Sequence, residues 1–152
     1  MSNTVNAEFS KKLAPTPAGL EVSVDKRDVV APTAAPTAND TQELCVLPAG
    51  TVPVDFQLFV PDLDTGATVT FSLGFLNTGK TDLSTAAAEG AAVLASAQTT
   101  AQGGGQLRNV AEALFKVTPV AYDRYFAVKY TGTFAGWQAG TFRAALSYRN
   151  AA

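Results

Sequence analysis

The stretch VPVDFQLFVPDLDTGATVTFSLGF, residues 52–75, decides how this chain is expected to fold. Apolar residues occupy the even positions of 52–60 and then, after PDLDTG, the odd positions of 67–75, with Phe59 as an exception to the first alternation. A period of two places one face of a strand in a core and the other face in solvent. Because a turn rich in Asp, Gly and Pro separates the two runs, they predict an antiparallel hairpin.

Three further runs show the same alternation, at residues 111–118, 122–130 and 142–148. The segment 81–98 is rich in alanine, which favours a short helix, but its end VLASAQ is equally typical of a strand. About six or seven short strands with at most one short helix predict an all-β fold. The expected architecture is an antiparallel β-sandwich or jelly-roll-like domain.

Residues 1–41 differ from the rest and are expected to form an extended arm before a β-sandwich domain at 42–152. The segments 13–19 and 31–40 consist largely of Ala, Pro and Thr, and proline favours extended backbone. Because such a segment buries little apolar surface, two interpretations stay open: a disordered tail, or an arm that becomes ordered against a neighbouring subunit. In the second interpretation, the candidate partner contacts are Leu13, Pro15, Pro17, Leu20, Val22, Val24, Pro32 and Pro36.

Composition and charge exclude several classes of function. The net charge is −2, and the basic residues, including the pairs at 11–12 and 26–27, are scattered solvated charges rather than a stripe that would attract nucleic acid. The single cysteine, Cys45, and the absence of histidine leave no disulfide, no zinc site and no common general base. No apolar stretch has the length of a membrane span. We therefore expect no cofactor, no nucleic acid and no membrane among the partners.

The segment GFLNTGKT, residues 74–81, matches the G-x-x-x-x-G-K-[ST] pattern of a phosphate-binding P-loop. A P-loop wraps its phosphate where a strand of a parallel sheet meets a helix. Here Phe75 continues an alternating strand, and no strand–helix–strand pattern surrounds the motif. The match is expected to be coincidental, with a turn at 77–80 in which Gly79 adopts positive φ.

The acidic turn PDLDTG, with Asp62 and Asp64, resembles the opening of a calcium-binding loop. An EF-hand loop ends in a glutamate, but the corresponding position here is Leu73. We expect a turn stabilised by the aspartate side chains, and a weak calcium site is the alternative. The other carboxylates are dispersed along the strands, and no serine has a histidine to activate it, so no enzymatic activity is predicted.

Two aromatic residues are candidate partner contacts. Trp137 lies in the glycine-flanked loop TFAGWQAG, residues 133–140, where it is typical of a contact anchor or a sugar-stacking platform. The alternative is that Trp137 caps one end of the sandwich. Tyr125 falls on the face of its strand opposite to Phe126 and is the second candidate.

The run LPAGTVPVDFQLFVPDLDTGATVTFSLGFLNTGKTDLS, residues 47–84, resembles small structural proteins of tailed bacteriophages, as does the closing strand TFRAALSYRN at 141–150. The resemblance implies a non-enzymatic capsid decoration (cement) protein on the outer surface of the head. Its implied partners are the major capsid protein and other copies of itself in a trimer. Two alternatives remain: a carbohydrate-binding module on the virion surface that uses Trp137 and nearby tyrosines, and a structural component of the tail or neck.

Overall fold

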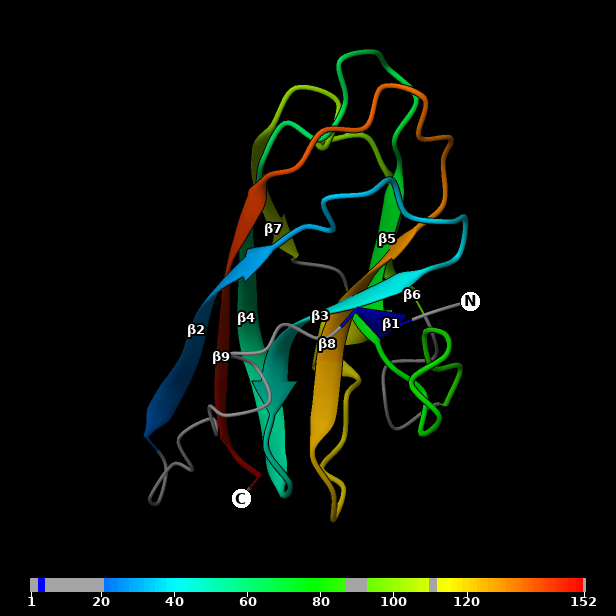
Figure 1. Cartoon of the computed structure of the whole chain (residues 1–152). Coiled ribbons are helices and arrows are strands. Elements are labelled where there is room, and N and C mark those ends of the chain that lie inside the picture. The colour runs from blue at the N-terminus through cyan, green and yellow to red at the C-terminus, as the bar shows by residue number, and fades with distance from the viewer. Residues whose placement is uncertain (1–2, 5–20, 87–92, 110–111, 152) are drawn as a thin grey trace.

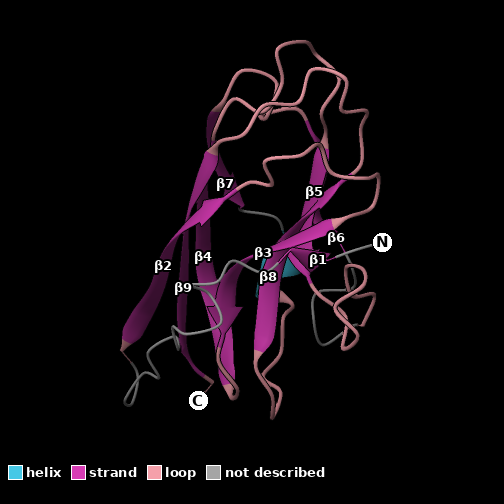
Figure 2. Ribbon diagram, viewed as in Figure 1, coloured by secondary structure: helices cyan, strands magenta, loops and turns pink. Residues whose placement is uncertain are grey.

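Two β-sheets pack face to face in the computed structural model, which describes residues 3–4, 21–86, 93–109 and 112–151 (Figure 1). Almost all of the regular structure is strand, and long loops gather at one end of the sheets (Figure 2). The single helix in these residues is short, and none is long and apolar enough to cross a membrane. The prediction of an all-β sandwich with at most one short helix is confirmed.

The two sheets contain five and four strands, and all pairings are antiparallel except that of β1 with β3. The five-stranded sheet has the order β1 (Asn3–Thr4), β3 (Thr41–Leu47), β8 (Arg124–Tyr130), β5 (Phe71–Phe75) and β6 (Val93–Gln98). The four-stranded sheet has the order β2 (Val22–Val30), β9 (Thr141–Asn150), β4 (Thr51–Val60) and β7 (Gly105–Asn109). The helix α1 spans Glu112–Phe115.

The hydrophobic core fills the space between the sheets, and aromatic rings lie at its centre. Phe56 of β4 stacks on Phe126 of β8 with ring centroids 3.9 Å apart. Phe75 of β5 meets Phe126 edge-on at 5.2 Å. All three side chains are fully buried. Because these rings come from both sheets, they hold the two layers together.

The predicted hairpin at 52–75 is wrong. β4 lies in the four-stranded sheet and β5 in the five-stranded sheet, so the PDLDTG segment crosses from one layer to the other. A period of two reports only which face of a strand is buried. Two strands that face the same core from opposite sheets show the same alternation as the two strands of a hairpin.

The predicted strand at 111–118 is also wrong, because α1 occupies Glu112–Phe115. Glu, Ala and Leu are strong helix formers, and Leu114 is the helix residue that enters the core while Phe115 is 69% exposed. Of the two possibilities for 81–98, the strand is observed at its end, as β6. The runs at 122–130 and 142–148 form β8 and β9.

β2 lies within residues 1–41, the segment expected to form an extended arm, and is a full strand of the four-stranded sheet. All nine residues of β2 pair with β9, from Val22 opposite Arg149 to Val30 opposite Thr141. The inward-facing residues include Asp25 and Arg27, whereas Val22 and Val24 are exposed. Arg27, which the sequence placed among the solvated charges, is buried in an ion pair with Asp25 at 2.8 Å. The exposure of Val22 and Val24 leaves them available to a partner, and their contact with one stays a prediction.

Candidate interaction surfaces

The P-loop-like residues form the end of β5 and a tight turn. The Asn77 side-chain oxygen accepts a hydrogen bond from the Thr81 N–H at 2.9 Å, and the Lys80 N–H donates to the Asn77 carbonyl at 2.9 Å. The residue with positive φ is Lys80, at 54°, and not Gly79 as predicted. The residue in the left-handed conformation is therefore the one that follows the glycine of the turn. This is a turn between strands, with no helix following it in the described residues up to 86.

The Lys80 side chain is held by the protein itself. Its Nζ donates to Glu43 Oε1 at 2.9 Å and lies 3.4 Å from the centroid of the Tyr125 ring. Glu43 is buried in β3, so its carboxylate fixes the ammonium group at the sheet surface. A P-loop lysine has to reach the phosphates of a nucleotide. The contacts of Lys80 support the interpretation that the sequence match is coincidental.

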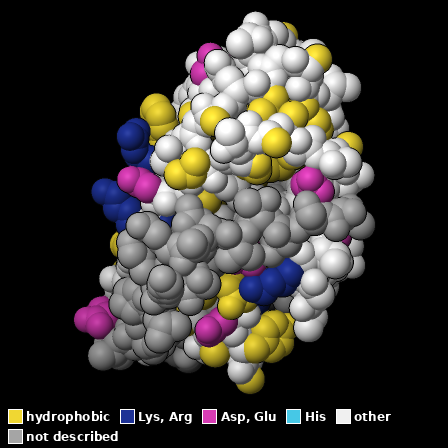
Figure 3. Space-filling view, in the orientation of Figure 1, with side chains coloured by type: hydrophobic (Ala, Val, Ile, Leu, Met, Phe, Trp, Pro, Cys, Tyr) yellow, Lys and Arg dark blue, Asp and Glu magenta, His cyan; other side chains and the backbone are white. Residues whose placement is uncertain are grey.

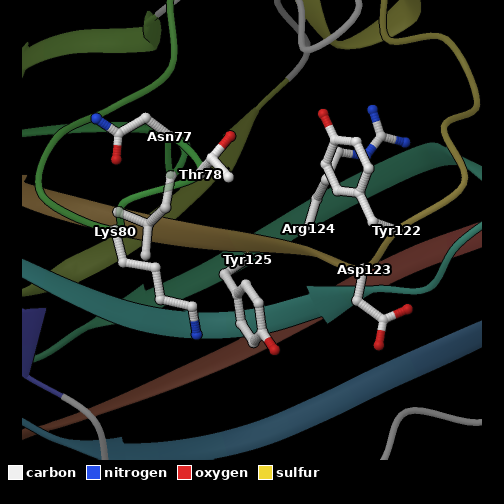
Figure 4. A pocket seen from close by; sticks show the side chains of 8 residues that line it. Asn77, Thr78, Lys80, Tyr122, Asp123, Arg124 and Tyr125 are labelled. Carbon is white, nitrogen blue, oxygen red and sulfur yellow. The ribbon is translucent and has the colours of Figure 1, made fainter.

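Tyr125, one of the predicted contacts, lies in a shallow pocket of about 240 Å³. Figure 4 shows the Lys80 side chain running towards its ring, with Tyr122 and Asp123 farther along the same rim. Tyr125 is half-buried and packs against the small cluster of Leu76, Leu83 and Ala127. Through these contacts Tyr125 holds the turn after β5 on its sheet, and its contact with a partner stays a prediction.

Trp137 caps one end of the sandwich, as the second of its two interpretations predicted. Its Nε1 donates to the Pro32 carbonyl at 3.0 Å, and its ring meets Tyr130 edge-on at 5.4 Å and Phe134 at 6.0 Å. The indole thereby joins the loop before β9 to the loop after β2. Pro36 is buried, so the prediction that it contacts a partner does not agree with its position in this fold.

Asp64 organises the loop that crosses between the sheets. Its Oδ2 accepts hydrogen bonds from the Thr68 N–H at 2.6 Å and the Val69 N–H at 2.8 Å, and its Oδ1 accepts from the Gly66 N–H at 3.0 Å. These backbone donors lower the pKa of Asp64 to about 2. Both oxygens face N–H groups, as the predicted aspartate-stabilised turn requires. Among the described residues, no three His, Cys, Asp or Glu side chains are placed to hold a metal ion.

Replacing Asp64 with asparagine is expected to destabilise the fold at neutral pH and to flatten its acid dependence. The carboxylate has a folded-state pKa of about 2, below its ordinary value of 3.8, so its contribution to stability is present above 3.8 and is lost as the pH falls towards 2. Urea unfolding measured between pH 2 and 7 tests this, with Asp28→Asn, an exposed carboxylate, as the control. An Asp64→Asn protein whose stability falls with acid as steeply as the wild type would contradict the assignment.

The outer face of the four-stranded sheet carries most of the remaining exposed side chains that suit contact with a partner. We define the outer face as the side chains of β2, β9, β4 and β7 that alternate with buried ones and point away from the core. Val22, Val24 and Val30 of β2 are 53%, 47% and 55% exposed, and Phe59 of β4 is 47% exposed. Exposed apolar side chains thus lie on β2 and β4, the two strands that flank β9 in this sheet.

A shallow hollow of about 270 Å³ lies in the outer face around Ala145. Lys26 and Gln57 are the cross-strand neighbours of Ala145, and Phe59 and Arg143 stand beside each other in the next row. The small alanine among these long side chains produces the hollow, with Lys26, Phe59 and Arg143 among the residues that line it. The Arg143 guanidinium lies 5.8 Å from the centroid of the Phe59 ring.

The outer face is basic although the chain as a whole is acidic. It holds four basic side chains, Lys26, Arg108, Arg143 and Arg149, and two acidic ones, Asp28 and Asp55, so that its net charge is positive whereas that of the chain is −2. Figure 3 shows basic side chains at the left edge of the molecule, with acidic and apolar side chains beside them. In the same orientation, β2 and β9 lie at this edge in Figure 1.

The basic side chains of the outer face differ in how they are paired. Arg108 forms two hydrogen bonds with Asp55, at 3.1 and 3.0 Å, which lower the pKa of that carboxyl. Arg143 approaches Asp28 only to 3.9 Å. Within the described part of the chain, Lys26 and Arg149 have no ion-pair partner.

The predicted contacts are distributed as follows. Val22 and Val24 lie on the outer face, Tyr125 in the pocket beside Lys80, and Pro32 and Trp137 at the capped end of the sandwich. Sequence reasoning missed Phe59, Lys26, Arg143 and Arg149. Phe59 was visible as the apolar residue that breaks the alternation of its strand. Leu13, Pro15, Pro17 and Leu20 lie outside the described residues.

No family model matches the chain, and no curated protein matches it. Two solved structures are similar. A chain from the capsid of Ralstonia phage GP4 is 31% identical, with a TM-score of 0.76 over 93% of this chain and 93% of that chain. A chain from the capsid asymmetric unit of cyanophage Pam1 is 23% identical, with a TM-score of 0.58 over 96% of this chain and 97% of that one. Because the Pam1 chain is only 23% identical, its similarity shows a shared fold alone.

Proposed function

The chain belongs to the same family as the GP4 capsid chain, and from this premise we propose that it is a non-enzymatic structural protein of a phage virion that decorates the outer surface of the head. The observation that carries the proposal is the likeness to the GP4 chain, which extends over 93% of both chains at 31% identity. A match of this extent includes the whole sandwich rather than one shared motif. The proposed partner is the major capsid protein of the shell.

Several buried or half-buried polar side chains stabilise loops of the fold, which agrees with a structural role. Asp64, Arg124 and Trp137 all hold loops in place: Arg124 donates to the Thr118 carbonyl at 2.9 Å and to the Thr51 carbonyl at 3.0 Å. Lys80 is held by Glu43. These contacts fix the two ends of the sandwich. A rigid unit of this kind can present a constant surface to many equivalent sites on a shell.

On a symmetric shell, individually weak contacts can together give tight binding of a decoration protein. We propose that three copies assemble around a threefold or quasi-threefold position, and that the segment with Leu13, Pro15, Pro17 and Leu20 extends from each copy to a neighbouring subunit. Several weak contacts made at once by a linked assembly give a much higher overall affinity than one contact alone. Parting the capsomers would then require the release of several contacts together.

The carbohydrate-binding alternative required an accessible Trp137. In the fold, the Trp137 indole donates to Pro32 and packs edge-on against Tyr130 and Phe134. A sugar platform needs an open ring face, whereas this ring is partly buried against the core. The geometry therefore favours a structural role for Trp137.

The test of the proposed function is binding of the purified protein to heads that lack it. Co-sedimentation is expected to show saturable binding, and electron microscopy of labelled protein is expected to place it on the outside of the head. Labelling confined to the tail or neck would overturn the decoration proposal and support the alternative of a tail component.

Deleting residues 1–20 removes the two-residue edge strand β1 but none of the other strands that the structure describes, so it is expected to leave a folded sandwich. This variant should bind heads about 10²-fold more weakly, because each copy loses one of its linked contacts. Deletion of residues 1–41 would not serve, since it removes β2 together with the buried Asp25 and Arg27. Urea unfolding checks the fold, and co-sedimentation measures the affinity. A protein in which residues 5–20 are replaced by a Gly/Ser segment of equal length separates loss of contacts from loss of length. Undiminished binding by both variants would refute the role of the arm.

A further inference from the structure

We infer that the outer face of the four-stranded sheet is the surface through which the protein docks, and that its partner is an acidic, partly apolar protein surface of the virion. This inference rests on the proposed function and specifies the chemistry of the partner. Its basis is the coincidence, on one face of one sheet, of exposed apolar side chains, a hollow, and basic side chains that have no ion-pair partner among the described residues.

The first observation is the exposed apolar area. Val22, Val24 and Phe59 each leave about half of their surface open, at 53%, 47% and 47%. Single exposed apolar residues are common, but here several share one face of one sheet. Val22 and Val24 lie on β2 and Phe59 lies on β4, with β9 between the two strands and its Arg143 beside Phe59. Aromatic and arginine side chains are enriched at the centres of protein interfaces. Phe59 with Arg143 therefore has the character of an interface centre.

The second observation is electrostatic. Lys26 and Arg149 have no ion-pair partner in the described residues, and the outer face is net positive on a chain of net charge −2. An acidic protein surface would supply the missing carboxylates and would be repelled elsewhere on this molecule, which orients the docking. Nucleic acid fits less well, because Asp28 and Asp55 stand among the basic side chains and would face its phosphates.

The third observation is the hollow around Ala145. It is lined by Lys26, Phe59 and Arg143, with an open volume of about 270 Å³. A glutamate or aspartate side chain of the partner can enter it and meet Lys26 and Arg143 while its methylene groups pack on Phe59. Arginine binds carboxylates through two parallel hydrogen bonds, so Arg143 would also fix the direction of approach.

Zero-length coupling with a carbodiimide on intact particles tests the inference directly, because it joins a lysine to a carboxylate only when the two are in contact. We expect Lys26 to be joined to an aspartate or glutamate of a different virion protein. The control is Lys116 of α1, whose Nζ lies 2.8 Å from Glu112 Oε1, and which is expected to couple within its own chain. Coupling of Lys26 only to another copy of the same chain would assign the face to self-association and overturn the inference. The inference would also be overturned if a soluble amine-reactive reagent modified Lys26 as readily in particles as in the free protein.

Charge reversal gives the second measurement. The double variant Lys26→Glu, Arg143→Glu is expected to bind heads at least tenfold more weakly with an unchanged melting temperature, and raised salt is expected to weaken the wild type in the same direction. Lys116→Glu is the matched control and should bind normally. Binding of the double variant at wild-type strength would overturn the inference while leaving the decoration proposal intact. Conversely, a protein located in the tail whose Lys26 couples to a tail carboxylate would overturn decoration and support the docking face.

Discussion

Replacing Asp25 with alanine is expected to lower the free energy of unfolding by about 3–5 kcal/mol, because it leaves the Arg27 guanidinium buried without its carboxylate. Arg27 Nε donates to both carboxylate oxygens of Asp25, at 2.9 and 2.8 Å. The Val46 N–H donates to the same carboxylate at 2.8 Å, across the gap between the sheets. The substitution therefore removes an ion pair and also a link between β2 and β3.

The loss should follow from the unpaired charge and not from the change in volume alone. In the double variant Asp25→Val, Arg27→Met, both charges are replaced by apolar side chains, and such replacements of a buried pair are often neutral or stabilising. The double variant still leaves the Val46 N–H without its acceptor, so it is expected to be less stable than the wild type but more stable than Asp25→Ala. Chemical unfolding of the two variants and the wild type measures the difference. Hydrogen exchange should show the amides of β2 losing protection first in Asp25→Ala. An ordinary substitution changes the free energy of unfolding by about 1 kcal/mol. If Asp25→Ala changes it by no more than that, the ion pair does not contribute appreciably to stability.

Replacing Phe126 with alanine is expected to cost about 3–5 kcal/mol, the range for truncation of a large aromatic residue in a core. Phe126 is fully buried, stacks on Phe56 at 3.9 Å and meets Phe75 at 5.2 Å. The cavity would therefore open where the two sheets meet. Since a whole domain has only about 5–15 kcal/mol of stability, this one change removes a large part of it.

Phe59→Ala provides the matched control within the same residue type. Phe59 is 47% exposed on the outer face, so its truncation should change the free energy of unfolding by no more than about 0.5 kcal/mol. Thermal and urea unfolding of both variants measure the contrast. Equal destabilisation by the two substitutions would contradict the assignment of Phe126 to the core and of Phe59 to the outer face.

The local elements of the fold were largely predictable from the sequence, but the pairing between them was not. Alternation located β4, β8 and β9, because each has one buried face. The same alternation assigned β4 and β5 to one hairpin, since a buried face does not tell on which side of the core a strand lies. The helix α1 was missed because four residues are too few to separate a helical period from a period of two.

β2 shows that an alternation of apolar residues does not by itself tell which face of a strand is buried. Val22 and Val24 alternate as core residues do, yet they are exposed, and the inward positions hold Asp25 and Arg27. Charged side chains enter a core only when a partner compensates their loss of water. That partner was two residues away on the same strand, together with an N–H of β3, and only the folded structure brings the three groups together. On the outer face, the sequence analysis named Val22 and Val24 as candidate contacts, but the neighbours that strand pairing gives to Phe59 and Arg143 could not be read from the sequence.

The position of β2 has a mechanical consequence. β2 begins at Val22 and lies at the margin of the four-stranded sheet, with every residue paired to β9. Tension applied to the preceding segment along the strand direction would load all of these pairs at once, in shear, rather than peeling them off in succession. The carboxylate of Asp25 adds a crosswise tie to the opposite layer. A load applied along this strand would therefore pass to the body of the sandwich instead of peeling β2 away residue by residue.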